Sequence, residues 1–209
     1  VGFIETIQGP ARNDPKAQER FLGIMLDQAS RMSRLIDDLL SLSRLEMRAH
    51  VAPSGEVDVG AICHHVIDAL TPMAGELGVE ISLKVPESPA IVTGDRDELI
   101  QVMENLIENA CKYGQSGKKV DVAVKVEEGG AIVATVRDYG PGIERQHVPR
   151  LTERFYRVDV DSSRAKKGTG LGLAIVKHIL TRHRARLVVT SEPGQGSTFG
   201  VRFPAPNLG

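Results

Sequence analysis

Apolar residues recur along the first quarter of the chain at the spacing of a long amphipathic helix. Asp14-Pro15 supplies an N-cap followed by proline at the first helical position, and the helical pattern runs to about Met47. Its apolar positions alternate in steps of three and four residues, which is a heptad seam. The seam consists of Leu22, Met25, Ala29, Met32, Ile36 and Leu39. Further leucines widen the stripe and favour a multi-helix bundle, namely Leu26, Leu35, Leu40 and Leu42.

The segment that precedes this helix, residues 1–7, is too short to be its full partner. We therefore expect most of the partner helix of a helical hairpin to be missing at the N-terminus. The alternative is that the long helix packs on the domain that follows it.

The pattern changes after Ala52-Pro53-Ser54-Gly55, which is the one convincing linker. Helical periodicity is predicted over residues 59–77, 95–113, 144–151 and 170–183. Strands are predicted over residues 80–85, 90–93, 119–126, 131–137, 187–191 and 198–203, and Gly129-Gly130 indicates a hairpin. These elements do not alternate as regular βαβ units. The predicted fold is an α/β sandwich, a mixed sheet with helices on one face.

The composition mainly excludes classes of protein and kinds of segment. The 26 lysines and arginines nearly balance the 27 acidic residues, so no global field points to nucleic acid. No apolar run approaches the roughly 20 residues of a membrane-spanning helix. Cys63 and Cys111 suggest neither a disulfide framework nor a metal site, and a reducing cytoplasm fits best. The start has no initiator methionine and no secretory signal, so we expect a piece of a longer protein.

A first candidate cluster lies on the predicted helix 95–113. Asn105, Asn109 and Lys112 are spaced at i, i+4 and i+7, so they share one helical face, opposite an apolar stripe. Two amides and an ammonium offer neutral oxygen ligands and a cation, which suits a magnesium-bound polyphosphate. A solvated helix face with ordinary polar residues is an equal alternative for this cluster alone.

A second cluster, Asp138-Tyr139-Gly140-Pro141-Gly142, follows an apolar strand. A carboxylate at a strand end could accept a hydrogen bond from an exocyclic amine, and the glycines permit close approach of a flat ligand. A type II turn with glycine at its left-handed position would also explain Pro141-Gly142.

A third cluster is the glycine-rich run 168–172, which opens a predicted helix and can present backbone N–H groups to phosphates. It is neither a P-loop nor a dinucleotide fingerprint. Cations at 154–157 and 164–167 precede it and suit a mobile lid over a nucleotide, or else an ordinary surface loop. The turn 194–199 is a fourth, weaker signal that a hairpin explains almost as well.

In order and spacing, these clusters resemble the N, G1, F, G2 and G3 boxes of the bacterial two-component sensor histidine kinases. Their ATP-binding domain, the Bergerat or GHKL fold, is shared with DNA gyrase B, Hsp90 and MutL. The resemblance covers essentially the whole chain and is greatest to the phosphate-responsive, PhoR-type kinases. It implies a partial dimerisation and histidine-phosphotransfer hairpin at residues 1–50, a linker at 51–55 and an ATP-binding catalytic domain at 56–209.

The resemblance also implies roles for individual residues. Asn109 would coordinate Mg²⁺, Asn105 and Lys112 would act near the phosphates, and Tyr113 would lie beside the nucleotide. Asp138 would bind the adenine amino group, with Gly140 and Gly142 making room for the ring. The lid and phosphate cradle would include Arg157, Lys166, Lys167, Thr169, Gly170, Leu171 and Gly172. The implied partners are a second copy of the chain through the hairpin and a response regulator. The implied location is the cytoplasmic side of an inner-membrane protein, with membrane contact only through a missing N-terminal part.

The sequence departs from the family in two places. Leu151 stands where the F box usually has an aromatic residue. None of the six histidines has the acidic neighbour and nearby proline of the family's phosphoacceptor; they are His50, His64, His65, His147, His178 and His183. Adjacent His64 and His65 would point different ways on a helix, which disfavours a metal pair. We therefore expect this chain to bind ATP without phosphorylating itself.

Two other functions are open. An ATPase or conformational clamp of the gyrase and Hsp90 kind would need a glutamate as general base on the predicted helix 95–113. Asn105 holds the corresponding position and cannot accept a proton, which favours the kinase. A non-catalytic ATP-binding scaffold for a response regulator is the other alternative, and the intact Asn109, Asp138 and glycine-rich residues speak against it.

Overall fold

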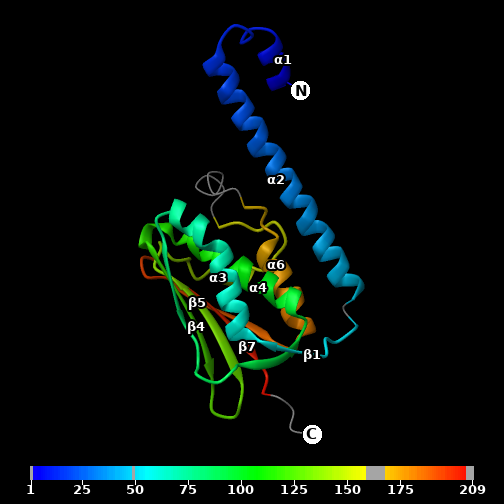
Figure 1. Cartoon of the computed structure of the whole chain (residues 1–209), viewed down its shortest axis with the longest axis vertical. Coiled ribbons are helices and arrows are strands. Elements are labelled where there is room, and N and C mark those ends of the chain that lie inside the picture. Colours follow the sequence, from blue (N-terminus) through cyan, green and yellow to red (C-terminus); the bar gives the residue numbers. More distant parts are fainter. Residues whose placement is uncertain (1, 49, 159–167, 206–209) are drawn as a thin grey trace.

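A long helix, α2, leads into an α/β domain and is preceded by a short helix, α1 (Figure 1). The structure is a computed structural model that describes residues 2–48, 50–158 and 168–205. Helix α1 spans Gly2–Gln8 and α2 spans Pro15–Met47. As predicted, Asp14 caps α2 by accepting a hydrogen bond from the Ala17 N–H at 3.0 Å, and Pro15 occupies the first turn.

The domain is built on a five-stranded mixed sheet with the order β2-β4-β5-β7-β6. Its strands are β2 (Glu80–Lys84), β4 (Lys119–Val126), β5 (Ile132–Asp138), β6 (Arg186–Glu192) and β7 (Gly196–Phe203). Only β2 and β4 pair in parallel, while the other neighbours are antiparallel. A separate two-stranded antiparallel sheet joins β1 (Gly55–Asp58) to β3 (Ile91–Gly94).

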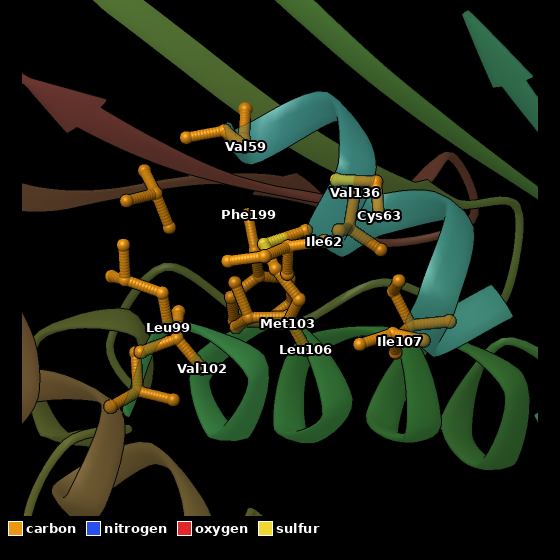
Figure 2. Packing of buried hydrophobic residues seen from close by; sticks show 14 of the residues in the cluster. Val59, Ile62, Cys63, Leu99, Val102, Met103, Leu106, Ile107, Val136 and Phe199 are labelled. Atoms are coloured by element: carbon orange, nitrogen blue, oxygen red, sulfur yellow. The ribbon is translucent and has the colours of Figure 1, made fainter. Parts of the chain in front are cut away.

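Three helices cover one face of the large sheet (Figure 1). They are α3 (Val59–Glu76), α4 (Arg96–Tyr113) and α6 (Gly172–Arg182). Leu99, Met103 and Leu106 of α4 pack toward α3 and the sheet, where they meet Ile62 and Phe199 (Figure 2). Along β4 and β5 buried residues alternate with more exposed ones, which is the pattern of a sheet covered on one face. The predicted α/β sandwich with a mixed sheet is confirmed.

Two predicted elements differ from the structure. The helix expected over residues 144–151 is only a 3₁₀ turn, η2 (Val148–Arg150), because Pro149 disfavours the helical conformation of the residue before it. The helix expected from Gly170 begins at Gly172, since Gly170 has a φ of +77°, which is outside the right-handed region. In addition, strand β1 was not predicted, and it includes Gly55 of the expected linker.

The long helix combines an exposed seam with a docked end. Leu22, Met32 and Ile36 of the predicted seam are more than half exposed in the single chain. Toward its C-terminal end, however, α2 packs on the domain, and Leu42 and Leu45 are 3% and 5% exposed. The alternative prediction, that the long helix packs on the domain that follows it, is therefore confirmed for the last turns of α2. The heptad seam nearer its N-terminus is exposed to solvent in the single chain. Among the described residues, no helix combines the length and apolarity that crossing a bilayer requires.

A buried polar network joins the start of α4 to the end of α6. The Asp95 N–H donates to Nε2 of His183 at 3.0 Å, so the other ring nitrogen, Nδ1, carries the proton and donates to the Ile179 carbonyl at 2.8 Å. Arg182 pairs with Glu98 at 2.8 Å beside this ring. Burial lowers the pKa of His183, the nearby Arg182 guanidinium adds to this, and the Ile179 hydrogen bond opposes it. The fold thus holds His183 in its neutral form.

The free energy of unfolding should therefore fall in mild acid. The folded-state pKa of His183 lies below the unfolded value of about 6.5, so the unfolded chain binds the proton first. The contribution is complete above about pH 6.5 and is lost as the pH falls toward the folded-state pKa. Urea unfolding between pH 7.5 and 5 should show a smaller pH dependence in His183→Gln than in wild type. Equal pH dependence of the two proteins would contradict this, and the exposed His64→Gln serves as the matched control.

Candidate functional site

The polar face of α4 forms one wall of the candidate site. Asn105, Asn109 and Lys112 are half-buried, whereas Leu106 and Ala110 of the same helix are buried, as the predicted spacing requires. The Lys112 ammonium contacts the Glu108 carboxylate at 2.5 Å, one helical turn back. The helix therefore presents two carboxamides and a cation beside the sheet, and the cation is held by a carboxylate of the same helix.

Asn105 lies against the start of α6. Its Nδ2 donates to the Gln101 carbonyl at 2.8 Å, which fixes the orientation of the carboxamide. A Cβ atom at Gly172 would overlap the Asn105 Oδ1 atom, so any larger residue here would force the Asn105 side chain to move. The sequence-predicted phosphate cradle is thus brought directly to the predicted polar helix face.

Asp138 ends β5 on the covered face of the sheet and is 5% exposed. Its Oδ1 accepts a hydrogen bond from the Gly140 N–H at 2.9 Å. Burial raises the pKa of this carboxyl group, and hydrogen bonds from Gly140 and Ser197 oppose the rise. Burying a carboxylate is costly unless it is hydrogen-bonded, and here Gly140 and Ser197 supply such bonds.

Glycines bring the backbone close to Asp138 from two sides. A Cβ atom at Gly140 would lie 2.7 Å from the Gly114 Cα and 2.9 Å from the Tyr113 carbonyl oxygen. Gly142 has a φ of +72°, the left-handed conformation that the predicted turn requires of it, and packs on the Glu192 backbone. The backbone geometry thus accounts for glycine at 142, and the ligand-binding interpretation of this segment stays a prediction.

The glycine-rich run closes the site opposite α4. Thr169 accepts a hydrogen bond from the Leu171 N–H at 3.3 Å, and the Gly170 carbonyl accepts one from the Phe155 N–H at 2.8 Å. A Cβ atom at Gly168 would lie 2.8 Å from the Tyr113 hydroxyl and 4.0 Å from Nη2 of Arg157. The predicted residues Tyr113, Arg157 and Thr169 are thus brought together. Lys166 and Lys167, also predicted here, lie outside the described residues.

Sequence reasoning missed the contribution of α2. The Thr169 hydroxyl donates to Oδ2 of Asp38 at 2.5 Å. Burial raises the pKa of Asp38, and the charges of Glu108 and Asp37 add to this effect. Nothing in the local pattern of residues 15–47 indicates such a contact, because it joins positions 131 residues apart.

Sequence reasoning also undervalued the turn before β7. Gly196 has a φ of +84°, and a Cβ atom there would overlap the Asp138 carbonyl oxygen. The neighbouring Ser197 is buried and binds Asp138. The paired glycines of the segment were the available signal, and they indicate backbone packing behind the buried carboxylate.

The donors present suit a magnesium nucleotide. The glycines beside the buried Asp138 carboxylate let backbone segments approach one another more closely than any side chain would permit. Carboxamide oxygens at Asn105 and Asn109 and the ammonium of Lys112 are of the kinds that bind Mg²⁺ and phosphate. In the described part of the chain, no group of three or more His, Cys, Asp and Glu side chains is arranged to hold a metal ion. A magnesium ion here would therefore rely on neutral oxygens and on the ligand.

Comparison with known proteins decides the family. Residues 94–207 match the family described as histidine kinase-, DNA gyrase B- and HSP90-like ATPase, and residues 1–48 match the His Kinase A (phospho-acceptor) domain. The chain belongs to the sensor histidine kinases. It is 39% identical over 204 residues to the phosphate regulon sensor protein PhoR of Pseudomonas aeruginosa, covering 97% of this chain and 45% of that protein.

Other relatives agree. The sensor-like histidine kinase SenX3 of Mycolicibacterium smegmatis is 35% identical over 192 residues, covering 92% of this chain and 50% of that protein. Among solved structures, full-length ShkA in complex with AMPPNP has a TM-score of 0.71 and 28% identity, covering 91% of this chain and 37% of that one. The histidine kinase chain thus spans about half the length, or less, of the curated relatives that it matches.

Gly140→Ala should destabilise this kinase chain by roughly 1–3 kcal/mol, because the new methyl group meets backbone atoms that cannot move independently. Gly75→Ala in α3 is the matched control, since nothing lies within 4 Å of its added Cβ atom. Urea unfolding should separate the two variants, with the control at or slightly above wild-type stability. Equal stabilities of the two variants would show that the backbone at Tyr113 and Gly114 can move away from the added methyl group.

Proposed function

We propose that residues 56–209 bind ATP with Mg²⁺ and transfer its γ-phosphoryl group to a histidine of a dimerisation hairpin, from which it passes to an aspartate of a response regulator. The observation that carries the proposal is the buried Asp138 carboxylate, which lies at a strand end between glycines. In this division of the chain, residues 1–50 belong to the hairpin and 51–55 form the linker.

The proposed roles combine the positions of the described residues with the roles that the family resemblance implies. Asp138 accepts a hydrogen bond from the adenine amino group, and Gly140 and Gly142 leave room for the ring. Asn109 is the proposed magnesium ligand, and Asn105 and Lys112 face the phosphates. The remaining nucleotide contacts are assigned to Tyr113, Arg157, Lys166, Lys167, Thr169, Gly170, Leu171 and Gly172. Support comes from the short distances that join these segments and, by similarity, from the AMPPNP complex of ShkA.

Catalysis in this arrangement consists of positioning and charge neutralisation. The Lys112 ammonium and the first N–H groups of α6 would offset charge on the transferred group. Asn105 would orient a phosphate oxygen without acting as a base, because a carboxamide does not accept a proton at neutral pH. A magnesium ion, when bound, would supply further neutralisation of the phosphate oxygens.

The phosphoacceptor must be supplied by another segment. Residues 1–48, which match the phospho-acceptor domain, contain no histidine. Of the histidines further along, His183 is buried in the α4–α6 network, and His147 is hydrogen-bonded to the Tyr156 hydroxyl at 2.6 Å. We propose that the acceptor lies on the first helix of the hairpin in the longer protein, and that the chain as given does not phosphorylate itself.

The wider assignment follows from the relatives. The exposed seam of α2 suits a homodimer through the hairpin. Similarity to a phosphate regulon sensor suggests a role in phosphate regulation, on the cytoplasmic side of an inner-membrane protein. An ATPase or clamp function is the second candidate, and the carboxamide of Asn105 in place of a general base disfavours it. A non-catalytic scaffold is disfavoured by the assembled donor set.

Asp138→Asn should weaken ATP binding roughly tenfold to a hundredfold, because it removes a charge-assisted hydrogen bond worth about 1.5–3 kcal/mol. Isothermal titration of the whole chain with ATP and Mg²⁺ measures the change. Asp68→Asn, on an exposed position of α3, is the control and should bind as wild type does. Unchanged affinity in Asp138→Asn would overturn the assigned adenine contact.

Phosphoryl transfer is tested by adding a complete helical hairpin that carries a phosphoacceptor histidine. Radiolabel from γ-labelled ATP should appear on the hairpin and not on the 209-residue chain. Asn109→Ala should reduce the label at saturating hairpin, and Asp68→Asn should not. Steady release of phosphate without labelling of the hairpin would favour the ATPase instead.

A further inference from the structure

Two donors of the proposed phosphate site are bound to carboxylates of the chain itself. The Thr169 hydroxyl donates to Asp38 at 2.5 Å, and the Lys112 ammonium contacts Glu108 at the same distance. Both donors belong to groups that this site would offer to phosphate oxygens. Asp38 accepts the single proton of the Thr169 hydroxyl, whereas the Lys112 ammonium keeps two further donors beside the one that Glu108 accepts.

Asp38 reaches Thr169 because one face of α2 is docked on the domain. Residues 38, 41, 42 and 45 lie at helical spacing on that face. Leu42 and Leu45 are buried, and the Ser41 hydroxyl lies 3.0 Å from the side-chain nitrogen of Gln101 in α4. Further along, Glu46 forms an ion pair with Arg154. The Asp38 contact is thus one part of a continuous interface and depends on the docking of the whole segment.

Asp38 and a phosphate group cannot share this position. A threonine hydroxyl has one proton to donate, and in this structure Asp38 accepts it. The Asp38 carboxylate is half-buried, and the charge of Glu108 acts on it. A polyphosphate would bring several more negative charges into the same space, where like charges repel. Either the carboxylate or the phosphate can occupy the Thr169 side of the site, but not both.

We propose that Asp38 acts as an internal competitor of the nucleotide phosphates, so that docking of α2 and binding of the ATP polyphosphate exclude each other. ATP binding then displaces Asp38 and releases the 38–46 segment of α2 from α4, α6 and the Arg154 segment. By linkage, a signal that changes the docking of α2 changes ATP affinity by the same factor. This inference rests on the proposed function, since it concerns the regulation of the same site.

The test compares ATP with adenosine, which lacks phosphates and should not meet Asp38. In Asp38→Ala the affinity for ATP, measured by isothermal titration with Mg²⁺, should rise by about fivefold or more, as expected for a coupling of this kind. The affinity for adenosine should be unchanged. Asp37→Ala removes the same charge from the adjacent, exposed position and should change the ratio of the two affinities much less.

The outcomes separate the inference from the proposed function. If Asp38→Ala leaves the ratio of ATP to adenosine affinity unchanged or lowers it, Asp38 does not compete with phosphate and the inference is wrong. If Asp138→Asn weakens the binding of neither ATP nor adenosine, or if wild type binds neither, the proposed function itself fails. Urea unfolding of each variant identifies a change that comes from loss of folding.

A second measurement uses the unmodified chain and does not depend on any substitution. Backbone amide hydrogen exchange of residues 38–46 should become faster when ATP is bound, because the docked helix end loses its buried contacts. Adenosine at saturation should leave this exchange unchanged. Unaltered exchange of residues 38–46 at saturating ATP would overturn the proposed exclusion.

Discussion

Burial of one face of α4 against α3 and the sheet is the constraint on which the geometry of the site depends. Leu99, Met103 and Leu106 enter the core from this helix (Figure 2). Each such side chain contributes roughly 1.5–3 kcal/mol when it is removed from water, so turning the helix by one residue would lose several of these contributions at once. The orientation of Asn105 and Asn109 is therefore determined by apolar packing on the opposite face. Their polar groups need no mutual contacts to stay in place.

The same principle explains how the fold accommodates a buried carboxylate. Alternation along β5 places Ile132, Ala134, Val136 and Asp138 on the covered face of the sheet. Ile132, Ala134 and Val136 stabilise the core. Asp138 lies at the end of β5, next to Gly114, where α4 ends. Burial alone would disfavour the charged form, but the Gly140 N–H and Ser197 offset part of that cost. The glycines around Asp138 let neighbouring backbone segments pack closely against it.

Most of the fold could be predicted from the sequence because its elements have strong local signals. Helices α2 and α4 begin at Asp caps, and the β4–β5 hairpin turns at paired glycines. Strand β1 was not predicted because its four residues are too few to show a clear alternation of apolar and polar side chains. The residues around Asp138 were predicted from local motifs. The contact of Asp38 with Thr169 was not, since a single polar pair between distant segments leaves no periodic pattern.

Helix α2 has an exposed seam on one face and a face docked on the domain, so it can connect a partner helix to the nucleotide site. Ile36 of the exposed seam and Asp38 of the docked face are two residues apart, so they point roughly 200° from each other around the helix axis. The docked face buries two leucines, Leu42 and Leu45, worth roughly 3–6 kcal/mol together before the loss of chain freedom is counted. Exposed ion pairs such as Glu46–Arg154 add little to this. A ligand that binds only the undocked state favours that state by about 2.7 kcal/mol at 100 times its dissociation constant and by about 4.1 kcal/mol at 1,000 times. A nucleotide in such excess can therefore offset a docking energy of this size, while the seam remains available to a partner helix.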